Sequence, residues 1–168
     1  DFAFLQQAGA VAGFTVEEAA TVALNGSRVS STRVREALQA ADFVEAEHLL
    51  GRPFAIAGRV VHGQKLGRQL GTPTANVQLK RHRVPLNGVF LVSMELEGVL
   101  QPGVANIGVR PSVKADGFAH LEVHLLDFAG DLYDRRVSVV FHHKLRDEQR
   151  FASLEALKSA IAADVVAA

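Results

Sequence analysis

The chain has 168 residues, which is enough for one well-formed hydrophobic core and an additional segment. Its 18 basic and 18 acidic residues give a formal net charge of +0, so overall charge does not select nucleic acid or an anionic membrane. The sequence has no cysteine, which excludes disulfides and thiolate metal sites and is typical of a cytoplasmic enzyme. No apolar run reaches the length of a membrane span. The chain begins at Asp1 without an initiator methionine or a basic leader, so we expect it to be cut from a longer one.

Residues 1–28 are rich in alanine, valine and glycine. Residues 14–16 and 21–24 are predicted to form short strands. The segment is too small to hold a core of its own. We therefore expect it to be the remnant of a preceding domain.

Two short helices are predicted next. Residues 29–35 read V-S-S-T-R-V-R, where Ser30 or Ser31 would cap a helix that runs to about Ala40. Hydroxyls and arginines at a helix start can bind phosphate, although an ordinary capped helix with solvated arginines explains the same residues. Asp42 begins a second helix, with Glu45 three residues later as in a capping box, and this helical pair is predicted to connect two domains.

From residue 54 onward the pattern changes to β. Six strands are predicted, at 54–61, 75–79, 88–97, 101–107, 120–127 and 136–141. Turn signals separate these short strands, which indicates a mainly β protein with a small antiparallel, Greek-key-like β-barrel. A C-terminal helix capped by Ser153 follows, with apolar residues at helical spacing. These are Leu154, Leu157, Ile161 and Val165.

The strand at 120–127 alternates between apolar residues on one face and polar residues on the other. Glu122, on the polar face, can accept a proton from a substrate hydroxyl, or it can form a cross-strand ion pair. His120, Glu122 and His124 also form an H-x-E-x-H pattern that can hold a transition metal, with His142 or His143 as a further ligand.

A glycine-rich stretch, G-Q-K-L-G-R-Q-L-G-T-P-T-A-N, occupies residues 63–76. Glycines allow close backbone approach to a ligand, and consecutive backbone N–H groups with Lys65 and Arg68 suit phosphate. Thr74 and Asn76 offer neutral oxygen ligands of the kind that Mg²⁺ takes. The stretch is neither a Walker A loop nor a Rossmann fingerprint, and an ordinary glycine-rich turn remains the alternative.

Taken together, five ordered motifs resemble the riboflavin kinase family. They are G-x-P-T-A-N ending at residue 76, G-V-F at 88–90, N-I-G-V-R-P-S at 106–112, L-E-V-H-L-L-D-F at 121–128, and the pair D-L-Y at 131–133 with L-R-D-E-Q-R-F at 145–151. Residues 29–35 also resemble a motif of the nucleotidyltransferase domain of bacterial bifunctional FAD synthetases. The departures are Leu66, Thr72, Phe90 and Ser112, none of which removes a catalytic group.

The resemblance implies a role for each matching position. Glu122 would be the general base that takes the proton of the ribityl 5′-hydroxyl. The remaining residues would bind the nucleotide (Gly63, Lys65, Gly67, Gly71, Thr74 and Asn76), Mg²⁺ (Thr74 and Asn76) and the flavin (Arg146 and Phe151).

The resemblance also implies a domain division and an activity. Residues 1–50 would be the C-terminal remnant of an FMN adenylyltransferase domain with linker helices, and residues 51–168 the riboflavin kinase domain. Riboflavin and ATP with Mg²⁺ would give FMN and ADP, without nucleic acid or membrane. The H-x-G-H-type motif of adenylyltransferases is absent, so the full-length parent rather than this chain would convert FMN to FAD. Two alternatives are a non-catalytic flavin- or nucleotide-binding module and a cupin-like metal protein.

Overall fold

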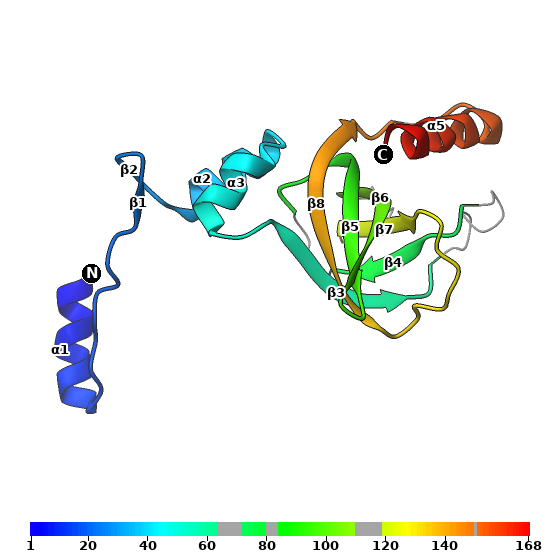
Figure 1. Cartoon of the computed structure of the whole chain (residues 1–168). Helices are drawn as coiled ribbons and strands as arrows, with labels where there is room; N and C mark the ends of the chain where they lie inside the picture. Colours follow the sequence, from blue (N-terminus) through cyan, green and yellow to red (C-terminus); the bar gives the residue numbers. More distant parts are fainter. Residues whose placement is uncertain (64–71, 80–83, 110–118, 150) are drawn as a thin grey trace. The chain divides into compact units, whose positions relative to one another are not determined.

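The computed structural model describes residues 1–63, 72–79, 84–109, 119–149 and 151–168. The chain divides into two compact units, Asp1–Ser31 and Thr32–Ala168 (Figure 1). The second unit contains the barrel and the candidate site.

The first unit holds a helix that the sequence reading missed. Helix α1 (Phe2–Ala12) begins where the Asp1 carboxylate accepts a hydrogen bond from the Phe4 amide at 2.9 Å, and it ends at Gly13 with φ 79°. The strand predicted at residues 14–16 is wrong, because no strand forms there. Of the strand predicted at 21–24, only Ala23–Leu24 (β1) is extended, and it pairs with β2 (Ser27–Arg28). Asn25 and Gly26 join the two strands with positive φ at both positions, as a tight hairpin turn requires.

The two predicted connector helices are present as α2 (Ser31–Gln39) and α3 (Phe43–Leu50). Asp42 caps α3 by accepting a hydrogen bond from the Glu45 amide at 2.9 Å, and Gly51 ends the helix with φ 68°. Phe43 places its ring 5.9 Å from Phe90 and 6.2 Å from Phe141, both of which belong to the barrel. Helix α3 therefore contributes an aromatic ring to the barrel core.

Six antiparallel strands close the barrel and confirm the predicted fold class. They are β3 (Ala55–Val61), β4 (Ala75–Gln78), β5 (Gly88–Leu96), β6 (Val99–Val109), β7 (Ala119–Leu125) and β8 (Arg136–Arg146). Around the barrel their order is β3-β4-β7-β6-β5-β8, so β7 lies between β6, the strand before it in the sequence, and β4, which is distant in sequence. This order brings residues from three separate motifs onto one stretch of the barrel wall.

Alternating side chains fill the barrel interior. The largest fully buried ones are Val60, Phe90, Val92, Met94, Ile107, Leu121, Val123 and Val139. Strand β7 alternates between buried and half-buried residues along its whole length, as the sequence predicted. Since Leu121 and Val123 point inward, Glu122 points to the outside of the barrel.

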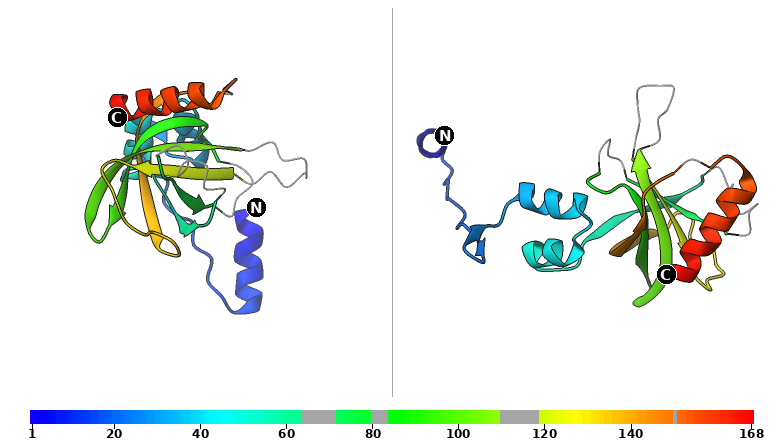
Figure 2. Two further views of the ribbon diagram at one scale, coloured as in Figure 1. Left: turned by 90° about the vertical axis from the view of Figure 1, so that its right-hand side faces the viewer. Right: turned by 90° about the horizontal axis from the view of Figure 1, so that it is seen from above.

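Helix α5 (Leu154–Ala167) lies against the outer surface of the barrel at one end (Figures 1 and 2). The Ser153 hydroxyl caps it, as predicted, by accepting a hydrogen bond from the Ala156 amide at 3.2 Å. The candidate site lies between this helix and the outer face of β5, β6 and β7.

Candidate active site

Strand register places three polar residues in one row. Glu122 on β7 lies directly opposite Asn76 on β4 and directly opposite Asn106 on β6. Directly opposed residues of antiparallel strands share a face, and neighbouring strands are separated by about 4.8 Å. The carboxylate of Glu122 is therefore flanked by an asparagine on each side, on the outer face of the barrel.

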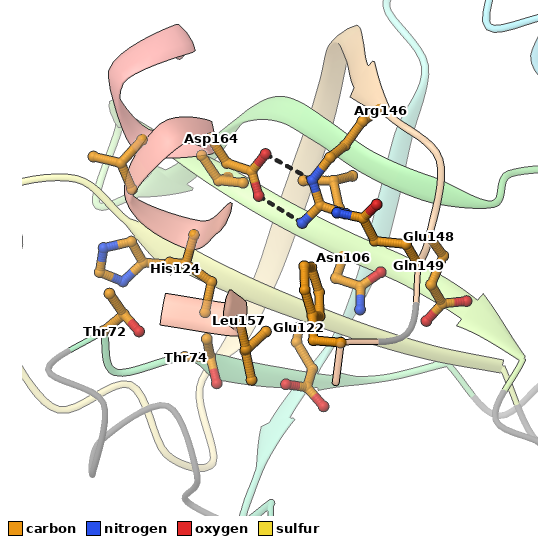
Figure 3. A pocket seen from close by; sticks show the side chains of 15 residues that line it. Thr72, Thr74, Asn106, Glu122, His124, Arg146, Glu148, Gln149, Leu157 and Asp164 are labelled. Carbon is orange, nitrogen blue, oxygen red and sulfur yellow. Dashed lines mark hydrogen bonds and ion pairs between the residues drawn. The ribbon is translucent and has the colours of Figure 1, made fainter. Parts of the chain in front are cut away.

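A cavity of about 240 Å³ lies over Glu122 and Asn106 of this row. Its floor is formed by Thr72, Thr74, Asn106, Glu122 and His124, which Figure 3 shows beneath helix α5. The roof is the apolar side of that helix, and a side wall comes from the end of β8 and the segment after it. Roof and wall residues include Leu157, Ile161, Val165, Arg146 and Phe151. The cavity thus combines an apolar roof with a floor that carries one carboxylate and includes Val89 and Val104 beside its polar residues.

Two polar atoms of the floor lack hydrogen-bond partners. Thr72 Oγ1 and Asn106 Oδ1 are buried and make no hydrogen bond within the part of the chain that the structure describes. Leaving such an atom unpaired costs about 1–3 kcal/mol. Polar groups of a bound ligand would remove this cost, so the two atoms mark the floor as a binding surface.

His124 fixes the segment that carries the threonines. Its Nδ1 lies 2.9 Å from the carbonyl oxygen of Pro73. A carbonyl can only accept, so the imidazole N–H donates. This bond ties Pro73, which lies between Thr72 and Thr74, to strand β7 beside Glu122.

Arg146 closes the cavity on the side of β8. Its Nε donates to Asp164 Oδ1 at 2.8 Å, its Nη2 donates to Asp164 Oδ2 at 2.7 Å, and its Nη1 donates to the Asp147 carbonyl at 3.1 Å. The guanidinium carbon lies 5.6 Å from the centre of the Phe151 ring. Figure 3 shows the paired contact with Asp164 on helix α5.

Asp147, the residue after Arg146, is exposed and pairs with Lys144 at 2.6 Å. The hydrogen bond from Lys144, together with its positive charge, lowers the pKa of the Asp147 carboxyl.

A second cavity of about 560 Å³ adjoins the first and shares Thr74 with it. Its lining is mostly apolar, and includes Val60, Ala75, Leu125, Phe128 and Tyr133.

Gly63, at the start of the glycine-rich stretch, lies against the side chain of Asn76. A methyl group at Gly63 would be 2.4 Å from Asn76 Nδ2 and 2.5 Å from Asn76 Oδ1. Only glycine lets the Asn76 amide occupy this position.

The sequence-predicted site residues fall into three groups. Thr74, Glu122, Arg146 and Phe151 line the first cavity. Asn76 lies beside Glu122 by register, with its amide against Gly63. Lys65, Gly67 and Gly71 lie outside the described residues, as does Arg68.

Several polar residues that line the cavity had no role predicted from the sequence, among them Asn106, Asp164, Glu148 and Gln149. Asn106 stands in a quoted motif, and its neighbours Ala105 and Ile107 are buried inside the barrel, so alternation places it outside. Asp164 is a carboxylate on the apolar side of a helix, three residues after Ile161. Charged side chains are rarely buried unless they are paired, so a carboxylate among the apolar positions of a helix is a sequence signal for a buried basic partner.

The predicted cluster for a transition metal does not form in the described residues, which hold no group of three histidine or acidic side chains able to bind a metal ion. His142 Nε2 lies 2.8 Å from the Ser93 hydroxyl instead. Within the same residues, no helix is both long and apolar enough to span a membrane.

Comparison with known proteins gives one consistent family. The riboflavin kinase (flavokinase) family model matches residues 50–168. A bifunctional riboflavin kinase/FMN adenylyltransferase of Pseudomonas fluorescens is 76% identical over 168 residues, and the protein of that name from Escherichia coli strain K12 is 53% identical over 171 residues. In both cases the match covers 100% of this chain and 54% of the relative.

A solved structure is similar to most of the chain. A macrolide-efflux protein from Streptococcus pneumoniae has a TM-score of 0.75 and 34% identity, over 92% of this chain and 51% of that one. The family model covers well over half of the chain, and the closed barrel, its C-terminal helix and the ordered motifs agree with it. The chain belongs to the riboflavin kinase family.

Proposed function

We propose that the chain transfers the γ-phosphoryl group of ATP to the ribityl 5′-hydroxyl of riboflavin, giving FMN and ADP. The observation that carries this proposal is the position of Glu122. It lies in register with Asn76, and it lines one cavity together with Thr74 beneath an apolar helix. Glu122 can accept the proton of a substrate hydroxyl, and the oxygens of Thr74 and Asn76 can act as neutral metal ligands. The apolar helix above them suits a flat ring, so the site suits phosphoryl transfer to the hydroxyl of a substrate that carries such a ring.

In this arrangement the flavin ring occupies the first cavity. Leu157, Ile161 and Val165 supply the apolar surface above it, and Arg146 and Phe151 form the side wall. The ribityl chain then runs along the polar floor toward Glu122. Thr72 Oγ1 and Asn106 Oδ1 would gain partners from its hydroxyls.

The nucleotide occupies the second cavity, whose apolar lining suits a purine base. Thr74 belongs to both cavities, so the phosphates would pass this residue on their way to the flavin. Gly63 begins the stretch that we expect to cover them, together with Lys65, Gly67 and Gly71.

Mg²⁺ fits the donor set at this junction. The hydroxyl of Thr74 and the amide oxygen of Asn76 are hard, neutral ligands, and the contact with Gly63 limits where the Asn76 amide can lie. When bound, the ion would neutralise charge on the phosphates. Asn76 and Thr74 would hold it.

Glu122 acts as the general base. Its carboxylate takes the proton of the 5′-hydroxyl while the hydroxyl oxygen forms a bond to the γ-phosphorus. The bond between that phosphorus and the bridging oxygen of ADP breaks, and ADP leaves with the electron pair. The rest of the site positions the two substrates, which is the main contribution of the protein in this class of reaction.

We also propose that residues 1–50 belong to an adenylyltransferase half with its linker helices, and residues 51–168 to the kinase. The chain spans 54% of the length of the curated relatives, whose names include both activities. A full-length parent would convert FMN to FAD. The buried contact of Phe43 with Phe90 means that the second linker helix packs with the kinase barrel.

The test is to incubate the chain with riboflavin, ATP and Mg²⁺ and to separate the flavins by chromatography. We expect FMN, and we expect Glu122→Gln, which keeps the shape of the side chain, to lower turnover by about 10²–10⁴-fold. Wild-type turnover in this variant would refute the role of Glu122.

The same preparation separates the two alternatives. A chain that quenches riboflavin fluorescence but yields no FMN would be a binding module. Stoichiometric transition metal in elemental analysis would favour a cupin-like metal protein.

A further inference from the structure

We infer that Asp164 is a positioning residue for the flavin site: its paired contact with Arg146 holds helix α5 over the cavity and fixes the guanidinium beside Phe151. This inference rests on the proposed function, because it assumes that the first cavity binds the flavin.

The burial of helix α5 is the first observation. Asp164 is 7% exposed, and it is the one buried side chain among those of α5 that the structure describes. The apolar residues Leu157, Ile161 and Val165 are only half-buried, and they border the cavity instead of a packed core. These apolar residues are thus only partly covered, and among the described side chains of α5 a carboxylate occupies the most buried position.

The geometry of the ion pair is the second observation. Asp164 receives two parallel hydrogen bonds from Arg146, at 2.8 and 2.7 Å. This two-pronged arrangement fixes the plane of the guanidinium as well as its position. A carbonyl at Asp147 accepts a third hydrogen bond at 3.1 Å, so three of the five N–H donors of the side chain already have protein partners.

The position of Phe151 is the third observation. The fixed guanidinium lies 5.6 Å from the centre of its ring, and both side chains line the cavity. A flat cation and an aromatic ring held at this spacing form a wall suited to a flat aromatic ligand. Asp164 would thus act on the flavin through Arg146, and not by contact with the reacting atoms.

The inference predicts which kinetic constants change. Glu122, Thr74 and Asn76 are carried by strands β7 and β4 and by the residues leading into β4, whereas the hydrogen bonds to Asp164 come from Arg146 on β8. Loss of the ion pair should therefore weaken riboflavin binding and leave ATP use and the chemical step in place. Loss of charge-assisted hydrogen bonds at a partly buried site corresponds to about 10- to 100-fold in affinity.

The experiment compares Asp164→Asn with Asp147→Asn. Both variants lose a carboxylate paired with a basic side chain, but Asp147 is exposed, pairs with Lys144 and does not line the cavity. Riboflavin binding is measured by fluorescence quenching without ATP, and KM for each substrate and kcat are measured by FMN formation. We expect Asp164→Asn to raise the riboflavin Kd and KM by 10- to 100-fold, with kcat and the KM for ATP within threefold of the wild type. Asp147→Asn should match the wild type.

Two further variants address folding. Asp164→Glu keeps the carboxylate and should restore riboflavin binding at least partly, whereas Arg146→Lys keeps the charge but loses the two-pronged contact and should behave like Asp164→Asn. A riboflavin Kd within twofold of the wild type in Asp164→Asn or Arg146→Lys would overturn the inference. So would an equal loss in kcat and both KM values with a lowered Tm, because that pattern indicates a purely structural role.

Failure of the proposed function gives a different result. A wild-type chain that makes no FMN refutes the kinase activity, while the fluorescence comparison of the variants still tests the role of Asp164 in flavin binding.

Discussion

Replacing Gly63 with alanine tests the nucleotide side of the site without removing any functional group. The added methyl group would lie 2.4 Å from Asn76 Nδ2, whereas ordinary contact begins at 3.4 Å. The Asn76 amide must therefore move by about 1 Å, the difference between these distances. A displacement of this size at a positioned group costs up to about 10²-fold in rate.

Stability should change much less than activity. The φ of Gly63 is not positive, so alanine is compatible with the backbone there. The atoms that the methyl group meets are the end of one flexible side chain, and a strained rotamer costs about 0.5–1.5 kcal/mol. The reduced entropy of the unfolded chain offsets about 0.4–1 kcal/mol of this. We expect a free energy of unfolding within about 1 kcal/mol of the wild type.

The assay is FMN formation at varied Mg-ATP, with thermal unfolding in parallel. Gly63→Ala should lower kcat/KM for Mg-ATP by 10- to 100-fold at nearly unchanged Tm. Asn76→Ala should cause a comparable loss, and the double variant should be no worse than Asn76→Ala, because the methyl group then has no amide to displace. Losses that multiply in the double variant would refute the reasoning. So would normal Mg-ATP kinetics in Gly63→Ala.

Two further predictions concern the flavin side and the connector helix. Asn106→Ala removes a buried oxygen that has no hydrogen-bond partner among the described residues, so we expect an unchanged or higher Tm together with a riboflavin KM raised by about tenfold. Normal kinetics would argue against a contact between Asn106 and the ligand. Phe43→Ala removes a ring that packs on Phe90 and Phe141, and it should lower the free energy of unfolding by about 3–5 kcal/mol in urea titrations. Val44→Ala, at a position 67% exposed on the same helix, is the control and should stay within about 0.5 kcal/mol.

Local signals in the sequence predicted much of the fold. Asp42, Gly51 and Ser153 end or begin helices as their capping chemistry requires. The alternation of β7 correctly separates the inward residues from the outward face that carries Glu122. These features depend on residues only a few positions apart, so a single sequence contains them.

Helix α1 shows where such signals are insufficient. Its sequence is rich in alanine, its polar side chains are the adjacent Gln6 and Gln7, and the cap at its start is the first residue, Asp1. Without an amphipathic period there was no pattern to distinguish a helix from short strands, and strands were predicted beside it.

Strand register accounts for the other omission in the candidate site. Asn106 and Glu122 are sixteen positions apart in sequence, yet they are opposed because β6 and β7 pair as they do. This register comes from the pairing of whole strands and not from neighbouring residues in the sequence. The order of the motifs therefore predicted that residues 106–112 and 121–128 both belong to the functional site. The position of Asn106 beside the Glu122 carboxylate became visible only from the pairing of β6 with β7.

The closed barrel explains why helix α5 is available to cover a ligand. Phe90, Met94, Ile107 and Leu121 fill the interior from the strands themselves, so the core is complete without the helix. The apolar side of α5 then faces the outer wall, where polar residues lie beside Val89 and Val104 and a cavity remains. Two such surfaces do not pack closely on one another, and a flat ligand with one polar edge would satisfy both. The buried ion pair between Asp164 and Arg146 is consistent with a helix that is held at one point while its apolar side stays open to the ligand.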